Sequence, residues 1–100
     1  MIHSYRGEDL SQGTIVLLFV KEDCQACRSM RKSIGWIASA REVYVADMNK
    51  FSELYDIHEV NGIPAFLLLQ DGHLVARSEG PCSFAELARR LGINTQEVTR

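Results

Sequence analysis

Residues 15–27 read Ile-Val-Leu-Leu-Phe-Val-Lys-Glu-Asp-Cys-Gln-Ala-Cys. The first six are an uninterrupted apolar run rich in β-branched and aromatic residues, and three charged residues follow them. Such a run is typical of a strand that is buried on both faces. Two cysteines at a spacing of three then follow at once, so Cys24 and Cys27 are expected where this strand gives way to the next element.

The next element is predicted to be a helix from Gln25 to about Ala40. Apolar residues recur there at intervals of three and four, which indicates one buried stripe. Asp23 or Cys24 is placed to cap its start. Gly35 lies in the helix interior, where glycine costs roughly 1 kcal/mol relative to alanine, and is expected to mark a bend or a close contact. The stripe consists of Cys27, Met30, Ile34 and Ile37.

The remaining pattern alternates in the same way. An Asp-Gly pair between two apolar runs is a strong hairpin signal, and Ser83 with Glu86 has the spacing of a capping box before a helix that Gly92 ends. The predicted elements are a strand over Glu42–Asp47, a helix over Asn49–His58, strands over Ala65–Leu69 and Leu74–Glu79, and a helix over Ser83–Leu91.

This order predicts an α/β fold with a mixed central sheet of about four strands flanked by helices on both faces. A strand-helix-strand opening implies parallel pairing, and the closing hairpin adds antiparallel strands. No repeat or linker divides the chain, so residues 1–100 are expected to form one domain. Residues 1–13 would be a short N-terminal segment and residues 93–100 a polar tail.

Composition narrows the class of partner. The chain has 100 residues, 46% hydrophobic and 24% charged, with a net charge of -2. This balance provides no basic surface for a nucleic acid and no segment for a membrane, so neither is expected as a partner. The first thirteen residues lack the apolar block of a secretory signal, and a cytoplasmic location is therefore expected. In reducing surroundings a close cysteine pair is more often catalytic or metal-binding than structural.

Cys24 and Cys27 lie one helical turn apart and can close a small disulfide ring. Unpaired N–H groups at a helix start favour a thiolate, which is the species that attacks disulfides. Cys24, outside the apolar stripe, is expected to attack, and Cys27, on the buried stripe, is expected to resolve the mixed disulfide.

Two other interpretations of the cysteines stay open. Both cysteines are small enough to be ordinary core residues. A zinc site would need Cys82 and one histidine as further ligands, and the chain has no second cysteine pair to favour it. Cys82 itself is either a third redox thiol, a regulatory site, a link between subunits or a half-buried residue at a helix start. The available histidines are His3, His58 and His73.

The chain resembles the thioredoxin family from about residue 14 to residue 91. The matching features are the strand that leads into Cys24-Gln-Ala-Cys27, the strand Val43–Asp47, the sequence Gly62-Ile-Pro-Ala65, the turn Gln70–His73 and Gly80. The resemblance implies a thioredoxin-like fold with a shortened N-terminus. It also implies a cis Pro64 beside the cysteines and an Ile63 backbone that pairs with an extended substrate segment.

The family's activity is thiol-disulfide exchange with protein disulfides, and the resemblance implies the same here. No cofactor beyond the Cys24–Cys27 disulfide is expected, and no metal. A thioredoxin reductase or another electron donor would be the second partner. The residues implied in substrate binding are Asp23, Gln25, Ala26, Ile63, Pro64 and Gly80.

Departures from the family pattern support two alternative functions. Asp23 stands where classical members have tryptophan, Gln25-Ala26 replaces Gly-Pro, and Leu18 occupies the position of the family's buried aspartate. An acidic neighbour disfavours a thiolate, and without the aspartate a proton must leave Cys27 by another route. A non-enzymatic binding module is therefore one alternative.

The second alternative is a glutaredoxin-like, glutathione-dependent reductase. Gly80-Pro-Cys-Ser83 faintly resembles the glycine-rich turn of that class, and Lys21 and Arg28 flank the cysteine loop, where either is placed to meet a glutathione carboxylate.

Overall fold

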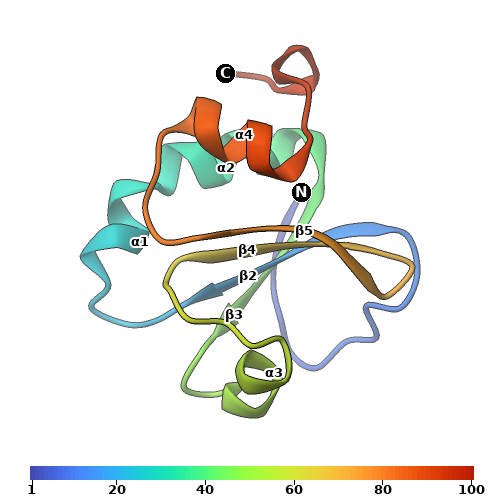
Figure 1. Cartoon of the computed structure of the whole chain (residues 1–100), viewed down its shortest axis with the longest axis vertical. Helices are drawn as coiled ribbons and strands as arrows, with labels where there is room; N and C mark the ends of the chain where they lie inside the picture. Colours follow the sequence, from blue (N-terminus) through green and yellow to red (C-terminus); the bar gives the residue numbers. More distant parts are fainter.

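The computed structural model describes residues 1–100 and contains a five-stranded sheet with helices on both faces (Figure 1). None of its helices combines the length and hydropathy that a membrane crossing requires. In chain order the elements are β1 (Ile2–Ser4), β2 (Thr14–Val20), α1 (Gln25–Ser29), α2 (Arg31–Ala40), β3 (Glu42–Asp47), α3 (Ser52–Ile57), β4 (Ala65–Gln70), β5 (His73–Glu79), α4 (Phe84–Leu91) and the 3-10 turn η1 (Thr95–Glu97).

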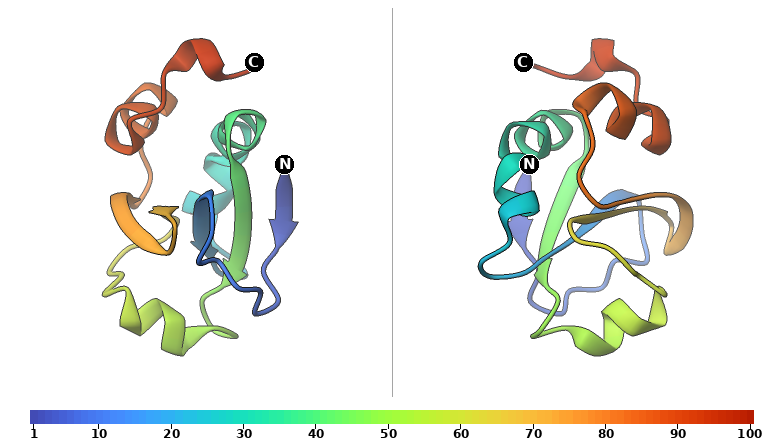
Figure 2. Two further views of the ribbon diagram at one scale, coloured as in Figure 1. Left: turned by 90° about the vertical axis from the view of Figure 1, so that its right-hand side faces the viewer. Right: turned by 60° about the vertical axis from the view of Figure 1, so that its left-hand side comes forward.

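The strands lie in the order β1-β3-β2-β4-β5. β3 pairs with β1 and β2 in parallel, whereas β4 pairs antiparallel with β2 and β5. The predicted α/β fold with a mixed sheet is confirmed. The expected four strands become five because β1 adds an edge strand beside β3 (Figure 2, left).

Backbone hydrogen bonds to β3 hold β1 in place. Tyr5 N donates to Val45 O at 2.8 Å, and Val43 N donates to Met1 O at 2.9 Å. The strand is only three residues long and has no alternating hydrophobic pattern, so sequence periodicity contains no sign of it. The first residues are therefore part of the sheet.

The central strand β2 separates two hydrophobic cores. Val16 and Leu18 contribute to the core beneath α2 and α4, and Leu17 and Phe19 contribute to the core beneath α3. Figure 1 shows α1, α2 and α4 over one face of the sheet and α3 over the other. The four side chains are at most 1% exposed, which confirms the prediction of a strand buried on both faces.

The single helix predicted from Gln25 to Ala40 is interrupted at Met30. The Met30 backbone has φ -102° and ψ 13°, and its N–H donates a hydrogen bond to Cys27 O at 3.2 Å, an i to i−3 bond that makes a tighter turn than the α-helix. Met30 is 3% exposed and packs in the core. The bend or close contact expected at Gly35 is absent, because α2 runs through Gly35 and nothing lies within 4 Å of a Cβ built there.

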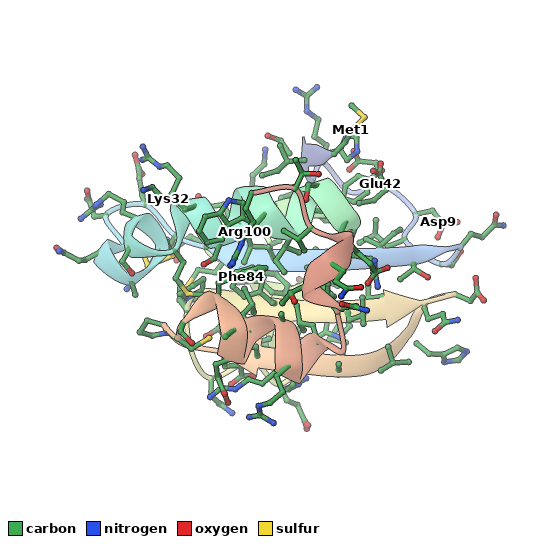
Figure 3. The ribbon with its side chains drawn as sticks, turned by 90° about the horizontal axis from the view of Figure 1, so that it is seen from above. Met1, Asp9, Lys32, Glu42, Phe84 and Arg100 are labelled. Carbon is green, nitrogen blue, oxygen red and sulfur yellow. A yellow bond between two sulfur atoms is a disulfide. The ribbon has the colours of Figure 1, made fainter.

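The C-terminal residues pack against the domain, contrary to the polar tail expected over 93–100. Ile93 is 5% exposed and belongs to the core beneath α4. The Arg100 guanidinium lies 5.1 Å from the ring centres of both Trp36 and Phe84, and Figure 3 shows Arg100 and Phe84 between α2 and α4. The polar composition of this segment hides the anchoring role of its one buried isoleucine.

The capping prediction for α4 is right in its main part. Ser83 Oγ accepts a hydrogen bond from Glu86 N at 3.1 Å, and Gly92 ends the helix with φ 67°. The Glu86 carboxylate binds Arg89 and Arg90 and does not close the reciprocal half of a capping box. These arginines hold the pKa of Glu86 below its usual value, with Arg89 as the main cause.

Candidate active site at the Cys24–Cys27 disulfide

The disulfide lies where β2 passes into α1. Cys24 and Cys27 are joined, with their Cα atoms 5.2 Å apart. Asp23, directly before the pair, has φ 56°, a left-handed conformation that only glycine, asparagine and aspartate adopt readily. The aspartate at this position thus permits the sharp turn that brings Cys24 to the start of the helix.

Cys24 is the N-cap residue of α1. Its Sγ accepts a hydrogen bond from the backbone N–H of Cys27 at 3.0 Å. A donor aimed at sulfur stabilises the thiolate more than the neutral thiol. The geometry therefore favours negative charge on Cys24 once the disulfide opens.

The burial of the two cysteines is the reverse of the expectation. Cys24 is 6% exposed, whereas Cys27 is partly exposed. The interruption at Met30 explains the difference, because α1 ends after about one turn and contributes no buried residue, while Met30 and Ile37 carry the buried stripe. Exposure thus gives no support to Cys24 as the attacking residue.

The loop before β4 lies beside the disulfide. The Ile63–Pro64 peptide bond is cis, and the Pro64 side chain is fully buried. The backbone N–H and C=O of Ile63 make no hydrogen bond within the chain. Gly80 N donates to Pro64 O at 3.0 Å, and Gly80 has φ 80°. This hydrogen bond joins the Pro64 loop to the residue that follows β5.

A groove of about 490 Å³ separates the disulfide from this loop, and we call it the loop-side groove. Four of the residues implied in substrate binding line it together with Cys24, whereas Pro64 and Gly80 do not line it. Those four are Asp23, Gln25, Ala26 and Ile63.

Five further residues line the loop-side groove, and of these the sequence singles out only Lys21 as a site residue, a contact for a glutathione carboxylate in the glutaredoxin-like alternative. Tyr55 lies within the helix predicted over Asn49–His58, and helical periodicity does not distinguish a side chain on a core face from one on a groove wall. No sequence signal singles out Met48. The additional residues are Lys21, Met48, Tyr55, Asn61 and Gly62.

Two β5 side chains hold residues 58–61, which lead into the Pro64 loop. The Arg77 guanidinium donates to His58 O at 2.5 Å and to the Glu79 carboxylate at 2.9 Å. Glu79 in turn accepts from Asn61 N at 3.3 Å. Partial burial lowers the pKa of His58, and the positive charge of Arg77 adds to that effect.

A second cavity, of about 540 Å³, lies on the other side of the disulfide, and we call it the helix-side groove. Cys27 borders this groove and not the loop-side groove, whereas Cys24 borders both. Leu18, the residue at the position of the family's aspartate, lines the helix-side groove and is 0% exposed. Thus no carboxylate at position 18 faces the space beside Cys27.

Cys82 is the one cysteine outside the disulfide. Cys82 is a free thiol whose Sγ lies 3.8 Å from Ser78 Oγ, and it borders neither groove. A zinc site needs a cluster of His, Cys, Asp or Glu side chains, and the structure contains no group of three or more that could hold a metal ion.

Comparisons with known proteins agree on one family. The family model Thioredoxin matches residues 5–92. The germline-specific thioredoxin Deadhead of Drosophila melanogaster is 26% identical, with a TM-score of 0.70 over 81% of this chain and 80% of that one. The Nicotiana alata thioredoxin NaTrxh is 25% identical, with a TM-score of 0.70 over 80% of this chain and 71% of that one.

A more distant likeness concerns the fold alone. A mutant thioredoxin of Halobacterium salinarum is 18% identical, with a TM-score of 0.75 over 88% of this chain and 84% of that one. No curated protein sequence matches the chain.

Proposed function

Because this chain belongs to the thioredoxin family of thiol-disulfide oxidoreductases, we propose that it reduces disulfides of other proteins, with Cys24 as nucleophile and Cys27 as resolving thiol. The observation that carries this assignment of roles is the hydrogen bond from Cys27 N to Cys24 Sγ at 3.0 Å. It supports the thiolate on Cys24 alone, and the thiolate is the attacking species.

The exchange proceeds in two balanced steps. The Cys24 thiolate attacks one sulfur of the substrate disulfide, which forms a mixed disulfide and releases the first substrate thiolate. Cys27 then loses its proton and attacks Cys24 Sγ, which forms the Cys24–Cys27 bond and releases the second substrate thiolate. The two protons of the dithiol end on the two substrate thiols, and two electrons pass from the protein to the substrate.

The loop-side groove suits an extended peptide as substrate. Ile63 offers an N–H and a C=O that make no hydrogen bond in the chain, and it shares this groove with Cys24. A peptide that pairs with the Ile63 backbone gains main-chain hydrogen bonds whatever its sequence. Such pairing positions a substrate disulfide beside Cys24.

Proton transfer differs from that expected of the family. Leu18 is buried and apolar, so no side chain at that position accepts the Cys27 proton. We propose that water in the helix-side groove, or the departing substrate thiolate, accepts it.

A stoichiometric assay with insulin tests the activity. The purified protein is reduced, freed of reductant and mixed with insulin, and the substrate thiols are counted after acid quench. The wild-type chain is expected to reduce one insulin disulfide per molecule, and the Cys24→Ser/Cys27→Ser variant none. A Cys82→Ala variant is the matched control and is expected to react as the wild type does.

Two results of this assay count against the proposal. Absence of insulin thiols with folded, fully reduced wild-type protein contradicts a reductase. Undiminished binding of a partner by the double serine variant, together with that absence, supports the non-enzymatic binding module instead.

A further inference from the structure

Gly35 has no structural requirement to be glycine. It lies inside α2 with helical backbone geometry, and a Cβ built there meets no atom within 4 Å. A glycine in a helix interior destabilises the helix by roughly 1 kcal/mol relative to alanine. Here the missing side chain leaves open space, because Gly35 forms part of the wall of the helix-side groove.

The helix-side groove combines an apolar interior with a cationic rim. Seven of its twelve lining residues are hydrophobic, among them Leu18. Lys21, Arg28 and Arg31 also line it, and none of them forms an ion pair within the chain. Asp23 is the one acidic residue on its wall. The groove therefore favours a ligand with an apolar body and a negative charge.

From these features we infer that the helix-side groove admits a low-molecular-weight thiol that carries an apolar body and a carboxylate, and that this thiol reduces the disulfide by attack on Cys27. The inference rests on the proposed function, since it supplies the electrons that the protein passes to its substrates. The volume of about 540 Å³ lies within the range of small-molecule pockets.

Two observations select Cys27 as the sulfur attacked. Cys27 is the more exposed cysteine and borders only this groove, so a thiol held here approaches it directly. Attack on Cys27 makes Cys24 the leaving group, and Cys24 Sγ accepts a hydrogen bond from Cys27 N. A leaving thiolate that is already stabilised departs faster.

The reaction balances with a dithiol as donor. One thiolate of the donor attacks Cys27 Sγ, which breaks the Cys24–Cys27 bond and releases the Cys24 thiolate. The second donor thiol then loses its proton and attacks the donor sulfur of the mixed disulfide, which releases Cys27 and forms an intramolecular donor disulfide. Two electrons pass to the protein, and the donor protons go to the two cysteines.

A matched pair of dithiols tests the charge requirement. Dihydrolipoate and dihydrolipoamide share the same dithiol and alkyl chain but differ in the carboxylate. We expect dihydrolipoate to reduce the oxidised protein about fivefold faster, the effect of one close charge contact in water, and the difference to shrink at high salt. Equal rates at low salt contradict the inference.

Variants then test whether the donor thiol binds in the helix-side groove. Gly35→Leu is expected to fill the groove, and Arg28→Glu/Arg31→Glu is expected to reverse the charge of its rim. Each variant should therefore lower the rate of reduction by dihydrolipoate, measured relative to the single-turnover rate of insulin reduction by the same variant. Gly35→Ala controls for the helix effect of removing glycine, and Lys32→Glu reverses a charge on the same helix outside the groove. Unchanged relative rates in both test variants overturn the inference.

The monothiol 3-mercaptopropionate identifies the sulfur that is attacked. An acid-quenched adduct on Cys27 is expected, and an adduct on Cys24 contradicts the inference. Insulin reduction by the pre-reduced protein is measured in parallel. If only the inference about the groove is wrong, insulin is still reduced; if the proposed function is wrong, it is not.

Discussion

The backbone N–H of Cys27 donates to Cys24 Sγ across 3.0 Å, so the residue proposed to resolve the mixed disulfide favours charge on the residue proposed to attack. Burial opposes this assignment, because Cys24 is only 6% exposed and Cys27 is the more accessible. For the reduced protein, the hydrogen bond therefore predicts that Cys24 is the more reactive thiol, whereas exposure predicts that Cys27 is.

Alkylation shows which of the two cysteines is the more reactive. With limiting iodoacetamide at neutral pH, we expect reduced protein to be modified first on Cys24, because the thiolate is the reactive form. Peptide mapping by mass spectrometry measures the order, and Cys82→Ala protein removes the third thiol from the comparison. Faster modification of Cys27 means that exposure dominates and the assigned roles are wrong.

Leu18 leaves no proton acceptor at position 18 of the groove that Cys27 borders. Replacing it with aspartate places a proton acceptor on the wall that Cys27 borders. We expect Leu18→Asp to release substrate from the mixed disulfide at least about tenfold faster than Leu18→Asn, a small part of what general bases provide. Rapid-quench kinetics measures the step. Both variants are expected to lose at least about 2 kcal/mol of stability, since a buried leucine is removed. Equal release rates show that a base at this position gives no advantage.

Two glycines have opposite backbone requirements. Gly80 has φ 80°, so Gly80→Ala is expected to cost roughly 1–2 kcal/mol. Gly35 lies in the regular helix α2, so Gly35→Ala is expected to stabilise the protein by up to about 1 kcal/mol. Urea unfolding measures both. Effects of the same sign contradict the backbone explanation.

The difference between these glycines shows what the sequence does and does not predict. Gly80 lies between the predicted strand Leu74–Glu79 and the capped helix that follows, so the sequence places it in a connection between two elements. The structure agrees, and Gly80 has φ 80° there. Gly35 gives no local sign of its surroundings, because most of the residues that line the cavity beside it belong to other parts of the chain, namely β1, β2, the loop after β2, α1 and β3. Long apolar runs such as Ile15–Val20 are predicted well because their signal is local.

The errors at the site arise from tertiary contacts. The interruption at Met30 follows from its packing in the core, and it reverses the expected burial of the two cysteines. β1 depends on hydrogen bonds to β3 and not on its own composition. Among the residues implied in substrate binding, Ile63 and Asp23 line the loop-side groove, whereas Gly80 does not line it and is hydrogen-bonded to Pro64.

His58 makes stability depend on pH. Burial, with Arg77 as a second cause, lowers the pKa of His58 in the folded protein, whereas the unfolded chain has the ordinary value of about 6.5. Below that pH the unfolded state binds more protons, so stability is lost as pH falls from about 6.5 through the folded pKa.

We expect the free energy of unfolding to decline less between pH 7 and about pH 5 in His58→Gln than in the wild type. Urea unfolding across this range measures the two slopes, and His73→Gln, at an exposed position in the β4–β5 hairpin, is the control. Identical slopes in all three proteins show that His58 does not titrate differently on folding.

Trapping the mixed disulfide tests the central claim most directly. A Cys27→Ser protein in the Cys82→Ala background keeps Cys24 but lacks a resolving thiol. Mixed with insulin and quenched in acid, it is predicted to carry one insulin chain covalently attached to Cys24, and a Cys24→Ser protein in the same background is predicted to carry none. An absence of adduct on Cys24, or an equal yield through Cys27, would contradict the assignment of Cys24 as the nucleophile.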